Sequence, residues 1–281
     1  AQFQLPDASP GASCSDGLDP DQQRAVTAVL QYGLVLLEGG PGTGKTSTVA
    51  RMLAAVLAQQ PGSRIQIAAP TGKAASRLRA ALASSSLQLP CSTLHRLLES
   101  RGERFGRNRH VPLALDLLVV DEVSMVDLPL MEALLDALPQ DCRLVLVGDA
   151  AQLAPVGPGP VLLDLQTPER RQALGDAAIA LRTTYRNNGA IAAVAAALRA
   201  GDDPLEPWLP SLLEPLPADA NLRWLEAPPR SLPSSLLERL RRHQERLAQR
   251  CRDCPPDDPA ATAALLAELE ACLVLTPLRR G

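Results

Sequence analysis

LVLLEGGPGTGKT, residues 34–46, joins a short apolar run to a glycine-rich stretch that ends in a lysine and a threonine. Consecutive large apolar residues followed by glycines are typical of a buried parallel strand. Residues 39–46 fit the pattern G-x-x-x-x-G-K-[ST], and helical periodicity resumes at about 45–58. A strand, a phosphate-binding loop and a helix in this order predict a P-loop NTPase of the α/β class.

The glycines of this loop allow its backbone N–H groups to face phosphate oxygens, and the next helix begins at the anion with its positive end. Lys45 is expected to reach the β- and γ-phosphates, and Thr46 to ligate Mg²⁺. The alternative is a glycine-rich turn with a solvated lysine, which the flanking strand and helix disfavour. The predicted nucleotide-binding residues of the loop are Gly39, Gly40, Pro41, Gly42, Thr43, Gly44, Lys45 and Thr46.

A second apolar run, residues 117–120, ends in two carboxylates. We expect Asp121 to hold the Mg²⁺ shell and Glu122 to orient and deprotonate the attacking water. A strand that ends in a solvated acidic turn is common, but its pairing with a phosphate loop favours the catalytic interpretation.

A third apolar run, residues 143–147, is followed by Gly148, Asp149 and, three residues later, Gln152. The carboxyl ends of parallel strands form the edge at which ligands bind. Gln152 is therefore a candidate sensor of the γ-phosphate, although an isolated glutamine in a loop is as commonly only solvated.

Strands and helices alternate along the first two thirds of the chain, which predicts a parallel sheet covered by helices on both faces. Besides the elements above, the expected strands are 64–69 and 178–181, and the expected helices are 20–31, 72–83, 92–99 and 128–138. Proline clusters after residue 201 and indicates a boundary. Beyond it we expect a strand at 221–226, helices at 234–252 and 260–271, and a last strand at 272–275.

The motifs occur in a characteristic order: Gln22, GGPGTGKT (39–46), APTGKAA (69–75), STLHRLL (92–98), VVDEVSM (119–125), VGDAAQLAPVGPG (147–159) and TYRNN (184–188). In this order they resemble superfamily 1 DNA helicases. Within that superfamily they are most similar to the RecD family, the alpha subunits of the RecBCD exonuclease V complex. The resemblance runs from about residue 18 to residue 281.

The resemblance implies a RecA-like ATPase fold and further site residues. Gln22 would read the adenine edge, Tyr185 would stack near the base, and Arg186 would reach the γ-phosphate as an arginine finger. The residues expected to contact the DNA strand are Thr71, Gly72, Lys73, Thr93 and His95. Judged without the resemblance, His95 is more often a structural histidine and Tyr185-Arg186 an ordinary surface pair.

The resemblance also implies ATP and Mg²⁺ as cofactors, 5′ to 3′ movement on single-stranded DNA, and action at duplex DNA ends with RecB-like and RecC-like subunits in recombination repair. The expected organisation is a disordered lead-in at 1–17, a first RecA-like ATPase domain at 18–203, and a linker with the incomplete start of a second RecA-like domain at 204–281. The late helicase motifs T-x-H-x-x-Q-G and T-R are not found in the sequence. We therefore expect a fragment that binds ATP without efficient unwinding.

Three alternatives remain open: a stand-alone RecD-like helicase, a nucleotide-gated interaction subunit without turnover, and an unrelated P-loop ATPase or GTPase. The sequence has no guanine-reading N-K-x-D motif, which disfavours GTP.

Composition excludes several classes of protein. The formal net charge of −3 excludes a uniformly basic nucleic-acid coat but allows a local basic groove. The sequence shows no apolar run of membrane-spanning length and no signal peptide, so we expect a cytoplasmic protein with no membrane partner. The six cysteines form no disulfide framework.

Three weaker signals have an ordinary and a functional interpretation. Residues 101–110 are rich in arginine and would suit a DNA-contacting hairpin or a solvated loop. Residues 237–247 predict an amphipathic helix with a basic face, more often solvated than bound to a partner. Cys251 and Cys254 have the spacing of half a zinc site, with no second pair nearby.

Overall fold

The structure is a computed structural model, and it describes residues 19–185 except 86 and 103, residues 191, 193–195, 197, 222, 223, 225, 227 and 228, and residues 231–275 except 256. Two compact units divide the chain, Ala1–Arg199 and Ala200–Gly281. The expected lead-in at 1–17 lies outside the described residues, as do 221, 224 and 226 of the strand expected at 221–226. The other three residues of that segment, 222, 223 and 225, are not in a strand.

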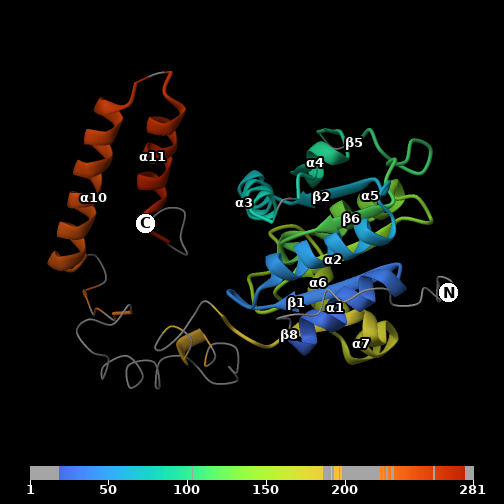
Figure 1. Cartoon of the computed structure of the whole chain (residues 1–281). Coiled ribbons are helices and arrows are strands. Elements are labelled where there is room, and N and C mark those ends of the chain that lie inside the picture. Colours follow the sequence, from blue (N-terminus) through green and yellow to red (C-terminus); the bar gives the residue numbers. More distant parts are fainter. Residues whose placement is uncertain are drawn as a thin grey trace. The chain divides into compact units, whose positions relative to one another are not determined.

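The first unit is built on a six-stranded sheet in the order β3-β2-β6-β7-β1-β8, and every pairing in it is parallel (Figure 1). The strands are β1 (Leu34–Gly39), β2 (Ile65–Ala69), β3 (Cys91–Thr93), β6 (Leu117–Val120), β7 (Arg143–Gly148) and β8 (Ala178–Leu181). The strand β1, which leads into the phosphate loop, lies between β7 and β8. The predicted RecA-like P-loop fold is thereby confirmed.

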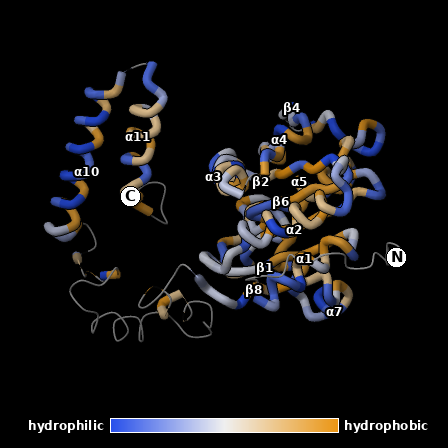
Figure 2. Tube along the Cα trace, in the orientation of Figure 1, coloured by the Kyte–Doolittle hydropathy of each residue, from blue (hydrophilic) through white to orange (hydrophobic). Residues whose placement is uncertain are grey.

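Helices cover both faces of this sheet because successive residues of each strand point to opposite sides. On one face pack α1 (Pro20–Gln31), α2 (Lys45–Gln59) and α3 (Gly72–Ala83). On the other pack α4 (Leu94–Leu97), α5 (Leu128–Ala137), α6 (Val161–Leu165) and α7 (Pro168–Leu174). Val35 and Leu37 of β1 belong to the first core and Leu36 to the second, and Figure 2 shows the hydrophobic strands between the helical layers.

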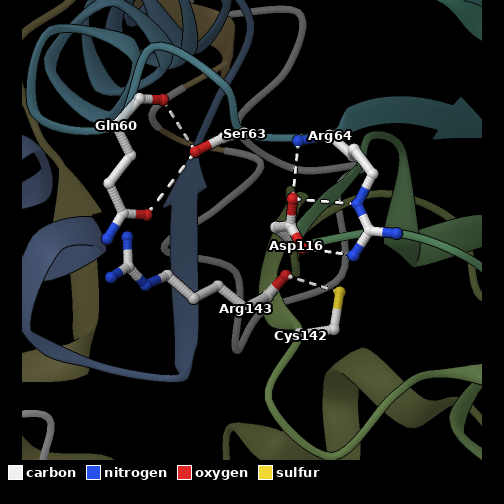
Figure 3. Close-up of polar contacts among 6 residues, drawn as sticks. All are labelled: Gln60, Ser63, Arg64, Asp116, Cys142 and Arg143. Carbon is white, nitrogen blue, oxygen red and sulfur yellow. Dashed lines mark hydrogen bonds and ion pairs between the residues drawn. The ribbon is translucent and has the colours of Figure 1, made fainter.

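The amino-terminal edge of the sheet is fastened by an ion pair between β2 and β6 (Figure 3). Asp116 accepts from the backbone N–H of Arg64 at 2.7 Å and from its guanidinium at 2.6 and 3.1 Å. These hydrogen bonds and the guanidinium charge lower the pKa of Asp116 to about 2. The same edge holds the half-buried Cys142 thiol, whose pKa burial raises to about 11.

The helix predicted at 92–99 was wrong. Instead of a helix at 92–99, the structure has the edge strand β3, Cys91–Thr93, followed by only one turn of helix. Thr93 caps this turn by accepting from the N–H of Arg96, and Glu99 adopts a left-handed φ of 52° that ends it. The open edge of β2 pairs Cys91–Thr93 as a strand, and this pairing overrides the local helical pattern.

The second unit contains the two predicted helices, α10 (Ser234–Asp253) and α11 (Pro259–Glu270). Arg246 and Arg250 of α10 donate to Glu268 of α11, which holds the two helices together. Cys272–Leu275 does not form the expected strand, since no neighbouring strand is present among the described residues of this unit to supply hydrogen bonds. The start of a second RecA-like domain therefore remains a prediction.

Candidate functional site: a phosphate loop at the carboxyl edge of the sheet

The phosphate loop connects β1 to α2 through two glycines with left-handed backbones. Gly42 has φ 79° and Gly44 has φ 82°, a region that side chains with a Cβ rarely adopt. Thr43 donates its hydroxyl to the carbonyl of Gly40 at 2.8 Å. The loop is thus shaped by its own backbone, and it ends where the N–H groups of α2 begin.

Lys45 is the first residue of α2, and its side chain folds back over the loop. Its Nζ donates to the carbonyls of Gly39 at 2.6 Å and Gly40 at 3.1 Å. The ammonium group therefore lies over the loop, where phosphate oxygens would replace these carbonyls as acceptors.

Two carboxylates follow β6 at the same edge. Asp121 donates its backbone N–H to the carbonyl of Ala68 in β2, which aligns the two strand ends. Burial and the neighbouring charge of Glu122 raise the pKa of Asp121 to about 6, while Lys45 acts in the opposite direction. A half-buried carboxylate close to a lysine and a phosphate loop fits a site for a divalent cation.

Glu122 has a left-handed backbone, with φ 54°. A non-glycine residue in this region costs about 1–2 kcal/mol and persists only where the surrounding structure fixes it. This left-handed residue ends the direction of β6 and begins the turn Val123–Met125.

The loop after β7 contacts the segment that follows these carboxylates. Ser124 Oγ donates to Gln152 Oε1 at 3.3 Å, joining the loops after β6 and β7. Asp149 is buried and accepts from the N–H of Ala151 at 3.1 Å, which fixes the start of the Gln152 loop. Gln152 is exposed and its oxygen is bound, so it is positioned by Ser124.

Gln22 and Tyr185, the residues expected to contact the base, both lie beside Gly44. A Cβ placed on Gly44 would be 3.0 Å from Gln22 Nε2 and 3.6 Å from Tyr185 Cε2, so both side chains lie against the loop. Gln22 is 6% exposed, whereas Tyr185 is 55% exposed and presents its ring to solvent. Arg186, the expected arginine finger, lies outside the described residues.

Asp19, the residue that caps α1, links these two residues. Its Oδ1 accepts from the N–H of Gln22 at 2.9 Å and its Oδ2 from the Tyr185 hydroxyl at 2.6 Å. Burial opposes ionisation of Asp19, but the hydrogen bonds from Tyr185 and from backbone N–H groups outweigh it and lower its pKa. The bond to Asp19 raises the pKa of Tyr185.

The expected DNA-contacting residues lie at the neighbouring strand ends. Thr71 caps α3 after β2, and Thr93 ends β3 directly opposite Ala69 of β2. Gly72 has no atom within 4 Å of where a Cβ would stand, and Lys73 follows it on α3. His95 is exposed, unlike a structural core histidine, and its ring centroid is 6.5 Å from that of Phe105.

Phe105 belongs to the arginine-rich segment, which forms a small antiparallel hairpin of β4 (Ser100–Arg101) and β5 (Arg104–Phe105). Arg107 pairs with Glu99 at 2.6 Å across its base. Arg101 and Arg104 are exposed, and within the described residues neither has an acidic partner. The hairpin thus presents the exposed guanidinium groups of Arg101 and Arg104.

A buried ion pair of this region was not predicted from the sequence. Glu38, the residue before Gly39, is bound by Arg171 of α7. A charged residue inside an apolar strand was the available signal, but its partner is distant along the chain.

The described part of the chain contains neither a metal-binding cluster nor a membrane-spanning helix. No group of three or more His, Cys, Asp or Glu residues there could hold a metal, and the Cys251–Cys254 pair therefore has no visible partners. Among those same residues, no helix combines the length and apolar character that crossing a membrane requires.

Comparison with protein families matches residues 22–158 to a family model described as an AAA domain. A RecBCD enzyme subunit RecD of Mycolicibacterium smegmatis is 45% identical over 224 residues, 70% of this chain and 40% of its own length. RecD of Mycobacterium tuberculosis strain H37Rv is 46% identical over 200 residues, 65% of this chain and 34% of its own length. The chain thus spans well under half the length of these relatives.

The ATP-dependent RecD2 DNA helicase of Deinococcus radiodurans is 43% identical over 149 residues, which is 53% of this chain and 20% of that protein. Among solved structures, a Bacteroides Pif1 helicase aligns with a TM-score of 0.48 and 17% identity, over 82% of this chain and 57% of its own. The sequence relatives confirm the resemblance that the motifs predicted.

Proposed function

Because this chain is RecD-like, in the superfamily 1 helicase group, we propose that its first unit is the ATP-hydrolysing motor domain of a DNA helicase subunit that works in recombination repair. The observation that carries this proposal is the meeting of the phosphate loop, the Asp121–Glu122 turn and the Gln152 loop at one edge of the sheet. ATP hydrolysis needs these three loops together, because positioning and charge stabilisation supply nearly all of the catalysis of phosphoryl transfer.

In this mechanism the loop N–H groups and Lys45 bind the β- and γ-phosphates. Thr46 and Asp121 would hold Mg²⁺, which would supply positive charge to neutralise the charge that develops on the phosphates. Glu122 orients a water for attack on the γ-phosphate and accepts its proton. Gln152 contacts the γ-phosphate, and Arg186 contributes a further positive charge to it.

The base binds between Gln22 and Tyr185. Gln22 can donate and accept one hydrogen bond each through its amide, which is the pattern of the adenine edge. The exposed ring of Tyr185 offers a stacking surface, and its bond to Asp19 keeps the ring against the phosphate loop. An uncharged amide and an aromatic ring at this position support ATP as the nucleotide.

Single-stranded DNA is the proposed track, bound across the ends of β2 and β3 by Thr71, Gly72, Lys73, Thr93 and His95. Their placement beside the Asp121 turn supports a coupling between hydrolysis and strand movement. The Arg101 and Arg104 hairpin extends this surface with groups suited to phosphate contacts.

The remaining assignments are extensions of the same proposal. Residues 204–281 would begin a second RecA-like domain, RecB-like and RecC-like subunits would be the protein partners at duplex DNA ends, and the complex would act in the cytoplasm. The identity to RecBCD subunits supports the choice of partners.

The test is ATP hydrolysis with and without single-stranded DNA, on this chain and on a version extended at its carboxyl end to the length of the relatives. We expect DNA-stimulated turnover in the extended protein and little in this chain. Lys45→Ala should lower turnover about 100-fold or more, because it removes the positive charge that stabilises the transferred phosphate.

Two results would change the assignment. Binding of ATP without turnover in both proteins would favour a nucleotide-gated interaction subunit over a motor. Turnover that Lys45→Ala leaves intact would place the chemistry elsewhere and overturn the site.

A second test concerns the hairpin. Arg101→Gln with Arg104→Gln should weaken binding of single-stranded DNA and reduce the slope of log affinity against log salt by about 1.4, or about 0.7 per lost phosphate contact. Arg51→Gln with Arg143→Gln removes two charges elsewhere, and serves as the control. Equal slopes in the two double variants would assign the hairpin to ordinary solvated surface.

A further inference from the structure

The carboxyl end of β1 carries a buried carboxylate that the proposed chemistry does not use. Glu38 is 7% exposed and directly precedes Gly39, whose carbonyl binds Lys45. In the sheet it stands between Gly148 of β7 and Ala180 of β8. A carboxylate at the centre of a parallel sheet is costly unless it is paired, so its partner is informative.

Arg171 of α7 is that partner, and it binds a second residue as well. Its Nη1 donates to Glu38 Oε2 and to Oε1 of Gln166, the latter at 2.7 Å. Gln166 ends α6, so one guanidinium joins α6 and α7 to the strand that leads into the phosphate loop. Burial raises the pKa of Glu38 in spite of Arg171, and Asp149 acts in the same direction as burial.

The helix α6 in turn lies against the loop that carries Gln152. A Cβ placed on Gly148 would be 2.7 Å from Leu162 of α6 and 3.5 Å from the backbone nitrogen of Ser124. Ser124 is the residue that binds Gln152. A continuous set of contacts therefore leads from Glu38, through Arg171 and α6, to the expected γ-phosphate sensor.

Stability alone is a weak reason for this ion pair. A buried pair gains little over apolar side chains of the same volume. Glu38 Oε1 and Gln166 Nε2 are buried without a hydrogen-bond partner among the described residues. The network therefore does not satisfy all of its own hydrogen-bonding groups either. What an arginine adds is a planar group that holds its acceptors in a fixed geometry.

We propose that Glu38 and Arg171 form a positioning pair that holds the Gln152 loop at a fixed position relative to the phosphate loop. The two loops then respond together to a γ-phosphate. This inference rests on the proposed function. Neither residue contacts the nucleotide; both act through Gln152.

The experiment measures the dissociation constants of Mg²⁺–ADP and Mg²⁺–AMP-PNP by titration calorimetry on the whole chain. The dissociation constant for ADP divided by that for AMP-PNP reports how well the γ-phosphate is sensed. This ratio can be measured without turnover. Gln152→Ala sets the ratio of an unsensed γ-phosphate. We expect Glu38→Gln and Arg171→Gln to lower the wild-type ratio about threefold or more toward that value, with ADP affinity within about twofold.

Arg170→Gln is the matched control, because Arg170 lies on the same helix in an exposed pair with Asp164. It should leave the ratio unchanged. Arg171→Lys keeps the charge and should retain more of the ratio than Arg171→Gln. If a single variant fails to fold, Glu38→Gln with Arg171→Gln removes both charges together and gives the same readout.

The outcomes separate the two proposals. Weak ADP binding that Lys45→Ala does not affect would overturn the nucleotide site itself. Normal ADP binding with an unchanged ratio in the Glu38 and Arg171 variants, even with a lower melting temperature, would make the pair merely structural. A wild-type ratio near one would also overturn the inference, since no sensing would exist to transmit.

Discussion

At the scale of single residues, the site depends on backbone shapes that only certain residues tolerate. Gly44 combines a left-handed backbone with close neighbours on its open side, Gln22 and Ser47. Its lack of a side chain thus serves two purposes: the loop can curl, and the adenine-side residues can approach. The pattern of glycines predicted the first purpose, and the tertiary structure added the second.

Gly44→Ala should therefore lower the free energy of unfolding by about 1–2 kcal/mol, the cost of a left-handed backbone for a residue with a Cβ. It should also weaken ADP binding, because the new methyl group meets Gln22 Nε2 at 3.0 Å. Urea unfolding and ADP titration measure the two effects. Gly62→Ala, at a glycine with open space around it, should change stability by less than about 0.5 kcal/mol. Equal effects of the two substitutions would contradict this explanation.

At the scale of elements, the sheet is fastened at both edges by polar contacts outside its ladders. The Arg64–Asp116 pair joins β2 to β6 at the amino-terminal edge, and Arg171 joins α7 to β1 at the carboxyl edge. Both side chains of the first pair are exposed, whereas in the second pair Glu38 is buried and Arg171 half-buried, so salt screens the first pair more strongly.

The depressed pKa of Asp116 predicts a pH-dependent contribution to stability. Its folded pKa of about 2 lies below the unfolded value of about 3.9, so the contribution is complete above about pH 5 and is lost as pH falls toward 2. Asp116→Asn should cost at most about 1 kcal/mol at pH 7, since the pair is largely exposed. The wild-type advantage should shrink in urea unfolding at pH 4 and again at pH 3.

Asp141→Asn, at an exposed aspartate, is the control for this series and should show no such trend. A wild-type advantage over Asp116→Asn that stays constant from pH 7 to 3 would show that the carboxylate charge contributes nothing at this edge.

At the scale of the whole molecule, the chain divides into a unit that contains the phosphate loop and a unit whose described helices carry no residue of the proposed nucleotide site. A ligand stabilises the elements that form its site. We therefore expect AMP-PNP with Mg²⁺ to slow hydrogen exchange in residues 39–48, 121–124 and 149–152, and to leave 234–270 unchanged. Mass spectrometry of the exchanged peptides measures this, with Lys45→Ala as the control. Equal protection of α10 and α11 would mean that the second unit takes part in nucleotide binding.

The sequence by itself determined the order of the motifs along the chain, the phosphate loop and the two carboxylates that follow β6. It also determined the helices α1, α2, α3, α5, α10 and α11, but neither α6 nor α7. These features follow from local patterns, namely apolar periodicity and glycines at turns. The same reasoning was wrong for residues 92–99, because the open edge of β2 decided their conformation. It was also wrong for 272–275, because a strand needs a neighbour that local patterns do not supply.

Only the tertiary structure decided which polar residues pair. Asp19 and Tyr185 are 166 residues apart in the chain, Glu38 and Arg171 are 133 apart, and Arg64 and Asp116 are 52 apart. Each partner alone is an ordinary polar residue in a strand, helix or loop. The parallel sheet brings them together because strands distant in the sequence become neighbours in it, and side-chain contacts of that kind leave no periodic signal in the sequence.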